Sequence, residues 1–206
     1  MTTLNQDVMQ SIVARYPRKR SAIMPLLHYV QSISGFVTNE GIETIAAILE
    51  IETAEVSAVA TFYTQYKRKP TGEYHIGVCT NTLCAVMGGD VILESLKEHL
   101  GLENDGVTDD GKVSIEHIEC NAACDYAPVV MANWEFYDNQ TVESAKELVD
   151  SMRAGNPKPP TRGPNRLVTY KEASAVLAGL NDGLAHEGVQ AGEPTLLGLK
   201  LSKEGK

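Results

Sequence analysis

Four cysteines constrain this chain more than any other feature, because they form two close pairs and each pair follows a predicted strand. The pairs are Cys79-x₄-Cys84 and Cys120-x₃-Cys124, with 35 residues between them. Residues 73–79 alternate apolar and polar side chains, and a second strand is predicted over residues 113–120. Neighbouring strands of an open α/β sheet place ligands at their carboxyl ends, so we expect all four sulfurs to lie close together.

This arrangement of thiols is compatible with three chemistries. Structural zinc sites commonly use Cys-x₂-Cys pairs, although wider spacings occur, and neither pair here has that spacing. Two disulfides would require an oxidising compartment. A [2Fe–2S] cluster needs four thiolates shared between two irons, which suits wider loops. The spacing favours a [2Fe–2S] cluster and leaves zinc and disulfides open. His75 and His117 lie near cysteines and are interpreted as ordinary strand residues, because the four thiols already complete a ligand set.

Residues 1–69 are predicted to form a small helical bundle. Thr38 and Thr53 are expected to cap helices, each with a glutamate two residues later in the first turn. Gly35 is expected to end one helix, and Pro17 separates a first short helix from the next. Apolar side chains recur at roughly helical spacing at Ile23, Leu26, Leu27, Val30, Ile33, Ile42, Ile45, Ala46 and Leu49.

Residues 70–155 are predicted to form a small α/β domain. After the first cysteine pair, Gly88-Gly89 leads into a helix that ends at Gly101. The second cysteine pair is followed by a hairpin predicted over residues 129–137, and Thr141 is expected to cap a final helix. The order β-α-β-loop-β-β-α fits an α/β sandwich, which gives an α+β chain overall.

Residues 156–206 are predicted to be a linker and an extended tail. The Pro- and Gly-rich stretch 155–164 disfavours regular structure. Residues 169–172 have the pattern of a capping box, which predicts a short helix. Farther on, Leu196, Leu197, Leu199 and Leu201 lie in a stretch with no predicted structure. Two interpretations of that stretch stay open, a disordered tail and an arm that becomes ordered on a partner.

The net charge of −9 is concentrated in one part of the chain. Residues 70–155 contain 4 basic and 16 acidic side chains, a net charge of −12, and this stretch contains every cysteine. Such a charge excludes non-specific binding of nucleic acid through this region. The sequence shows no secretory signal and no run of about 18 apolar residues that could span a membrane. We therefore expect a cytosolic protein with reduced cysteines.

Three stretches resemble one known family. They are residues 16–27 (Tyr-Pro-Arg-Lys-Arg-Ser-Ala-Ile-Met-Pro-Leu-Leu), residues 59–64 (Val-Ala-Thr-Phe-Tyr-Thr), and the two cysteine pairs with Ala127-Pro128 behind them. The chain is similar over residues 14–154 to the 24 kDa-type subunit of respiratory NADH:quinone oxidoreductase (complex I), known in bacteria as the E subunit. That family is a group of thioredoxin-like [2Fe–2S] ferredoxins. The chain departs from it after the third cysteine, where Asn121-Ala122 replaces the usual Leu-Gly, and the Asn121 side chain is a candidate hydrogen-bond donor to a nearby sulfur.

The resemblance implies an N-terminal helical domain (1–69), a thioredoxin-like [2Fe–2S] domain (70–155) and a partner-binding C-terminal tail (156–206). It also implies that Cys79, Cys84, Cys120 and Cys124 bind the cluster, which exchanges one electron with FMN. FMN and NADH are expected on an adjacent flavoprotein subunit and not on this chain. In agreement, no Gly-x-Gly-x-x-Gly follows a predicted strand. Other peripheral-arm subunits of complex I are expected as partners, at the cytoplasmic side of the plasma membrane.

Rival functions stay open. The same kind of subunit occurs in the diaphorase module of an NAD-linked hydrogenase or formate dehydrogenase. A free-standing ferredoxin and a zinc-stapled interaction module without redox activity are alternatives of other classes. Because the cysteines lie in a strongly acidic segment, which disfavours adding an electron, we predict a low reduction potential. We further predict that deletion of residues 165–206 leaves the cluster intact and weakens binding of the flavoprotein subunit.

Overall fold

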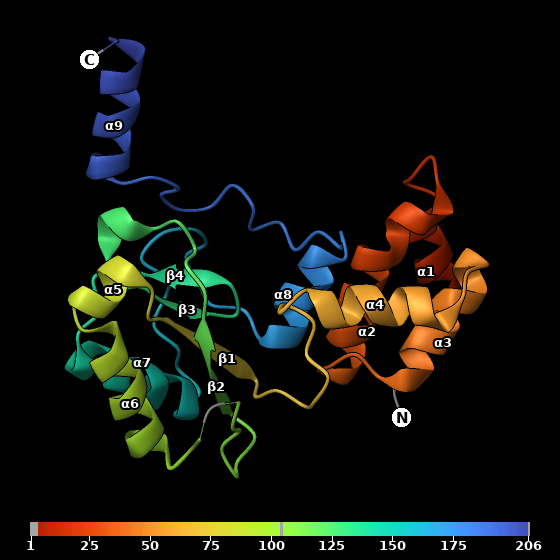
Figure 1. The fold of residues 1–206 in the computed structure, drawn as a ribbon, viewed down its shortest axis with the longest axis horizontal. Helices are drawn as coiled ribbons and strands as arrows, with labels where there is room; N and C mark the ends of the chain where they lie inside the picture. Colours follow the sequence, from red (N-terminus) through yellow and green to blue (C-terminus); the bar gives the residue numbers. More distant parts are fainter. Residues whose placement is uncertain (1–3, 104, 206) are drawn as a thin grey trace. The chain divides into compact units, whose positions relative to one another are not determined.

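The computed structural model describes residues 4–103 and 105–205, and the chain divides into two units. The first unit comprises the chain up to Glu73 together with Val168–Asp182. The second comprises Tyr74–Leu167 together with the segment from Gly183 onward. Each unit therefore takes part of its structure from the C-terminal segment, coloured blue in Figure 1.

The first unit is helical, as predicted, and local chemistry sets the ends of its helices. The Asn5 side chain caps the first helix by accepting a hydrogen bond from the Asp7 N–H at 2.9 Å. Thr38 caps the third by accepting one from the Gly41 N–H at 3.0 Å. Gly35 ends the second helix with a left-handed backbone (φ 81°), which only glycine adopts without strain. The helices are α1 (Gln6–Val13), the 3₁₀ turn η1 (Lys19–Ala22), α2 (Ile23–Ser34), α3 (Asn39–Leu49), α4 (Thr53–Phe62) and α8 (Tyr170–Leu177).

The predicted cap at Thr53 is wrong by one residue. Thr53 is the first residue of α4, and Glu52 takes the cap position with an extended backbone. The Glu55 carboxylate accepts a hydrogen bond from the Glu52 N–H at 3.3 Å, which is one half of a capping box between these two glutamates.

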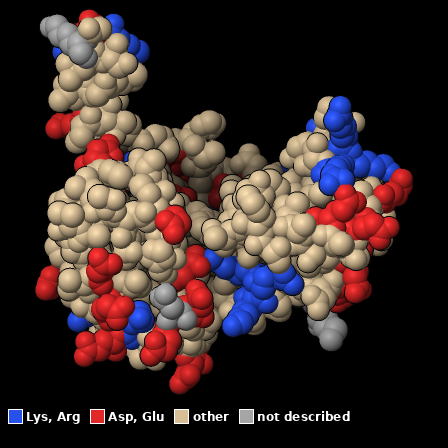
Figure 2. Space-filling model, in the orientation of Figure 1, with Lys and Arg blue, Asp and Glu red and all other residues tan. Residues whose placement is uncertain are grey.

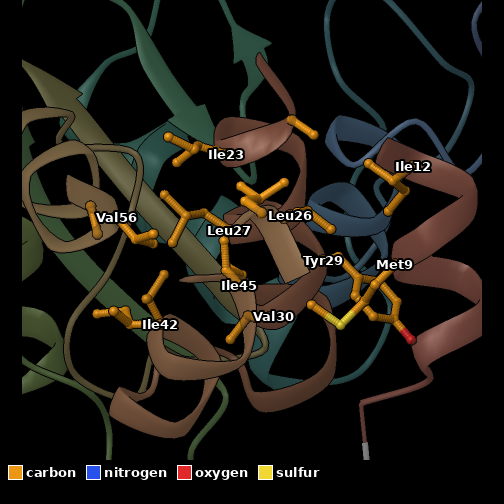
Figure 3. Close-up of a cluster of buried hydrophobic side chains, with 14 of the residues drawn as sticks. Met9, Ile12, Ile23, Leu26, Leu27, Tyr29, Val30, Ile42, Ile45 and Val56 are labelled. Atoms are coloured by element: carbon orange, nitrogen blue, oxygen red, sulfur yellow. The ribbon is translucent and has the colours of Figure 1, made fainter. Parts of the chain in front are cut away.

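A continuous hydrophobic core fills the first unit (Figure 3). Its fully buried members come from α1, α2, α3 and α4, so that four amphipathic helices bury one stripe each. They include Met9, Ile12, Leu26, Leu27, Val30, Ile45 and Val56.

Helix α8 belongs to this bundle, although residues 156–206 were predicted to be a linker and tail. Tyr170 is 1% exposed, and its N–H donates to the Glu73 carbonyl at 2.8 Å. The Lys171 ammonium donates to the Ile33 carbonyl at 2.9 Å. The predicted capping box is confirmed, with the Thr169 hydroxyl accepting from the Glu172 N–H at 3.3 Å. An amphipathic helix must bury its apolar face somewhere, and α8 buries it against α2.

The second unit is built on a mixed four-stranded sheet in the order β2-β1-β3-β4. Strand β1 (Tyr74–Cys79) pairs in parallel with β2 (Val113–Ile118) and antiparallel with β3 (Val130–Ala132). The predicted hairpin is confirmed as β3 and β4 (Glu135–Tyr137). Strand β2 ends at Ile118 rather than at the predicted Cys120, so Cys120 lies in the loop after β2, and Cys124 begins the 3₁₀ turn η2 (Cys124–Tyr126).

Helices α6 (Gly89–Leu100) and α7 (Val142–Arg153) cover one face of this sheet (Figure 1). The alternate β1 residues Tyr74, Ile76 and Val78 point to this face, as the period-2 pattern predicted. The expected ends of both helices are confirmed: Gly101 ends α6 with φ 67°, and the Thr141 hydroxyl accepts from the Ser144 N–H at 3.2 Å. The second core includes Ile92, Leu96, Ile115, Val130, Leu148 and Met152.

Two helices of the second unit lie where no helix was expected. Helix α5 (Thr82–Val86) lies between the first two cysteines. Helix α9 (Glu193–Lys203) contains the four C-terminal leucines, for which no structure was predicted; none of its residues is buried. Within the residues that the structure describes, no helix is long and apolar enough to cross a membrane.

Candidate metal centre

The first cysteine pair is buried at the carboxyl end of β1. Cys79 is the last residue of that strand, and its N–H donates to the Val129 carbonyl at 3.2 Å. Cys84 lies on α5, and each of the two residues is 3% exposed. A short helix therefore turns the second cysteine back toward the first, within an apolar cluster that also contains Ala123 and Ala127.

Two glycines allow α6 to begin directly against this pair. Gly88 caps the helix with a left-handed backbone (φ 104°). A Cβ on Gly89 would lie 2.5 Å from the Cys79 carbonyl oxygen and 2.9 Å from that of Cys84, which is closer than atoms can pack. The Gly88-Gly89 pair that marks the helix start in the sequence is thus also required by close packing against both cysteines.

The second cysteine pair lies on the exposed loop after β2. Cys120 and Cys124 are both exposed, and their sulfurs are 3.7 Å apart. The Ala122 N–H donates to the Cys120 sulfur at 3.4 Å. Ala122 has a left-handed backbone (φ 56°), so this chain places alanine in a conformation that favours glycine. The donor described at this sulfur is the backbone of Ala122, whereas the expected donor was the Asn121 side chain.

The sheet brings the two pairs to the same edge, as predicted. In the parallel register of β1 and β2, Cys79 lies opposite Ile118, so both cysteine loops leave the sheet at the same end. The Asn81 amide of the first loop donates to the Glu119 carboxylate of the second at 3.1 Å. Sequence reasoning missed this contact, because its two partners lie in irregular loops.

The thiols also affect one another electrostatically. Burial raises the pKa of the Cys79 thiol to about 11, and the neighbouring Cys84 and Cys120 add to the increase. The hydrogen bond and negative charge of Cys120 raise the pKa of Cys124. Thiolates so close together repel one another, and a cation bound between them would relieve that repulsion.

The geometry fits a centre in which ligands act in pairs. Two sulfurs bonded at about 2.3 Å to one tetrahedral metal stand about 3.8 Å apart, close to the separation of Cys120 and Cys124. A [2Fe–2S] cluster divides four thiolates between two irons, so pairs are the arrangement that it requires.

The two histidines near the cysteines have the structural positions predicted for them. His75 is buried in β1, with its Nδ1 2.7 Å from the Ser114 hydroxyl and its Nε2 2.9 Å from the Glu116 carboxylate. His117 is exposed on β2. Trp134 packs its ring edge against His75 in the hairpin, with ring centroids 6.2 Å apart.

The C-terminal segment contacts the second cysteine loop, which no sequence pattern had indicated. The Thr195 hydroxyl, at the start of α9, donates to the Asp125 carboxylate at 2.6 Å, and Gly192 packs against the Tyr126 hydroxyl. The Arg162 guanidinium lies 4.9 Å from the centre of the Tyr126 ring. These partners are 36 to 70 residues apart, so local patterns could not reveal them. We call residues 158–165 and 187–195 the strap, because both stretches pack beside the second cysteine loop or beside strand β4.

Arg162 is the best-anchored residue of the strap. It pairs with the Asp138 carboxylate at 3.0 Å, and both side chains are largely buried, with 16% and 7% exposed. Its guanidinium also lies 4.2 Å from the centre of the Phe136 ring. A buried, stacked ion pair of this kind holds the strap firmly on β4.

Comparison with known proteins identifies the family. The sequence profile described as "Thioredoxin-like [2Fe-2S] ferredoxin" matches residues 9–153. The chain belongs to the thioredoxin-like [2Fe–2S] ferredoxin family. The predicted α+β fold, with N-terminal helices before a thioredoxin-like domain, is therefore confirmed.

Two of the relatives that the sequence matches are named as subunits of NADH-quinone oxidoreductase. The E subunit of the NADH-quinone oxidoreductase of Mycobacterium tuberculosis is 58% identical over 196 residues, which cover 95% of this chain and 77% of the relative. NADH-quinone oxidoreductase subunit 2 of Thermus thermophilus is 39% identical over 153 residues, covering 73% and 84% of the two chains. The resemblance found in the sequence is thereby confirmed.

A solved structure shares the fold at low sequence identity. A chain of an NAD⁺-reducing [NiFe]-hydrogenase superimposes with a TM-score of 0.59 at 17% identity. The match covers 66% of this chain and 23% of the hydrogenase chain, so it spans less than a quarter of that chain.

Proposed function

We propose that this chain is the iron–sulfur electron-transfer subunit of the NADH-oxidising module of NADH:quinone oxidoreductase, with Cys79, Cys84, Cys120 and Cys124 binding one [2Fe–2S] cluster. The observation that carries the proposal is the meeting of two cysteine pairs at one sheet edge. The 58% identity to a subunit of that complex supports the assignment.

Each part of the site has a distinct role in this proposal. When bound, a [2Fe–2S] cluster supplies one-electron oxidation and reduction. Cys79 and Cys84 hold it on the buried side, where Ala127 and Val129 exclude water. Cys120 and Cys124 hold it on the exposed side, and the Ala122 N–H stabilises the Cys120 thiolate by hydrogen bonding.

The surroundings of the site favour a low reduction potential. Glu119 and Asp125 each adjoin a cysteine of the exposed pair, and negative charge close to a cluster opposes the addition of an electron. We expect a redox titration followed by electron paramagnetic resonance to give a low midpoint. A midpoint above about −150 mV, in the range of Rieske centres, would contradict this reasoning.

The other reactants are expected on partner chains. NADH and FMN would be held by an adjacent flavoprotein subunit, and a cluster held by Cys79, Cys84, Cys120 and Cys124 would supply one-electron exchange with that FMN. The chain thus works within the peripheral arm, at the cytoplasmic side of the plasma membrane. A second candidate host is a hydrogenase or formate dehydrogenase diaphorase module, and the subunits that co-purify with the chain distinguish the hosts.

The decisive experiment combines metal analysis with reduction by NADH. We expect the purified chain to be red-brown, with two irons and two acid-labile sulfides per chain. We expect NADH to reduce it when catalytic amounts of the FMN-containing flavoprotein subunit are present. Cys84→Ala and Cys124→Ala, which remove a ligand atom altogether, should each lose the visible spectrum, whereas His117→Gln, a change on the neighbouring strand, should keep it. A colourless protein with stoichiometric zinc would overturn the proposal in favour of a zinc-stapled module.

A further inference from the structure

Helix α5 and the start of α6 expose four apolar side chains beside a candidate ligand. Leu83, Val86, Met87 and Val91 are 42%, 80%, 53% and 60% exposed. Cys84, on the same short helix, is only 3% exposed. Helix α5 therefore presents one side to the metal centre and an apolar side to solvent. We call these four residues the α5 patch.

This exposure is unusual for residues that have no role in the core. Side chains of this kind are the ones that a fold usually buries, yet four of them are exposed within a stretch of nine residues. Contiguous apolar surface of this kind on a soluble domain marks a site of protein interaction. Over α5, Figure 2 shows a surface almost without charged side chains.

Acidic side chains border the α5 patch on one side. Asp90 and Glu94 flank Val91 on α6, and Glu98 and Glu103 continue along that helix and the loop after it. These acidic residues line a shallow depression on the outer face of α6, together with Lys97, whose ammonium pairs with the Glu94 carboxylate at 3.0 Å. Figure 2 shows acidic side chains gathered on this part of the second unit. A complementary partner would offer an apolar centre with basic residues beside it.

We propose that the α5 patch, with its acidic border on α6, is the surface on which the flavoprotein subunit docks to exchange electrons. This inference rests on the proposed function. Electron transfer slows steeply with distance, and a helix with its side chains is only about 10 Å across, so a partner on α5 lies close to Cys84. The α9 leucines are also exposed, but α9 has no cysteine on it and no acidic border comparable to that of α6.

The test uses the cluster-loaded full chain and the FMN-containing flavoprotein subunit from the same organism. Val86→Lys places a positive charge in the α5 patch. The variant would lose an apolar contact with the flavoprotein subunit, and its new charge would face the basic residues expected on that partner. We expect the Kd to rise at least about tenfold and NADH-driven reduction of the cluster to slow in parallel. Val91→Lys should behave alike, and Glu94→Lys should slow association with reduced dependence on salt. The control Ala47→Lys, at an exposed residue of α3 in the first unit, should change the Kd less than about twofold.

Two readouts keep the inference separate from the function on which it rests. The visible spectrum and reduction by dithionite report an intact cluster in every variant, so a folding defect cannot be mistaken for lost docking. If the unvaried chain binds the flavoprotein and Val86→Lys and Val91→Lys bind equally well, the α5 patch is refuted while the proposed function stands. If the unvaried chain neither binds nor is reduced, the proposed function itself fails.

Discussion

Replacing Gly89 with alanine should disturb the candidate metal centre without touching a cysteine side chain. The added Cβ would lie 2.5 Å from the Cys79 carbonyl oxygen, whereas such carbon–oxygen contacts are normally about 3.3 Å or longer. Helix α6 or the cysteine backbone must therefore move by roughly 0.8 Å. Overpacking of this kind costs about 2 kcal/mol, which lowers the melting temperature of a chain of this size by roughly 4–8 °C.

The assay for Gly89→Ala is iron and acid-labile sulfide per chain, together with a thermal melt of the loaded protein. We expect both values to fall, because relieving the clash moves the backbone of a candidate ligand. Gly198→Ala is the matched control: it is also helical, has no atom within 4 Å of its Cβ position, and should stabilise α9 slightly. Full iron content and an unchanged melt in Gly89→Ala would refute the close packing of α6 on the cysteines.

Replacing Ala122 with glycine should relieve the strain of its left-handed backbone (φ 56°) and add up to about 1 kcal/mol to the free energy of unfolding. The melting temperature should rise accordingly, and an unchanged or lower value would contradict this. Burial lowers the pKa of His28 to about 4, below its value of 6.5 in the unfolded chain. The first unit should therefore lose stability as the pH falls below 6.5, by about 2 kcal/mol at pH 5. Urea unfolding of His28→Leu should not show that loss. Arg162→Met removes the cation from the buried Asp138 carboxylate, which keeps the hydrogen bond from the Thr161 hydroxyl, and should cost about 3 kcal/mol. Arg166→Met, at an exposed position, should cost almost nothing in the same melts. Deletion from Glu193 onward removes a helix that buries nothing and should leave iron content unchanged; a large loss would show that Thr195 is essential to the loop it contacts.

The structure also changes the prediction about deletion of residues 165–206. That truncation would remove Leu167 from the core of the second unit and Tyr170 from the first. It would damage both units, and so it cannot isolate the role of the tail. The shorter deletion from Glu193 onward tests partner binding without that damage.

Much of the fold could be predicted because the interactions that begin, end and orient its helices and strands join residues close in sequence. Caps such as Thr38 and Thr141 act within three residues, and the alternation of Tyr74, Ile76 and Val78 reports a buried strand face directly. The cap predicted at Thr53 was wrong because a glutamate beside it can also cap a helix. Helix α5 was missed because five residues are too few to show a helical period.

The meeting of the cysteines was predictable and their unequal exposure was not. Their convergence follows from parallel strands whose ends share an edge. The burial of Cys84 depends on α5, and the contact between Asp125 and Thr195 joins residues 70 apart. Contacts of that range depend on the tertiary fold and have no pattern in a single sequence.

The division of each unit between distant parts of the chain affects its synthesis. The first unit includes Val168–Asp182, so its N-terminal helices emerge from the ribosome well before α8 exists. Residues 74–167 are synthesised in the interval between the N-terminal helices and α8. During that time α2 lacks α8, which packs against it in the finished protein. An unfinished chain therefore exposes apolar surface on α2 that a finished chain buries, which lets chaperones and proteases distinguish the two.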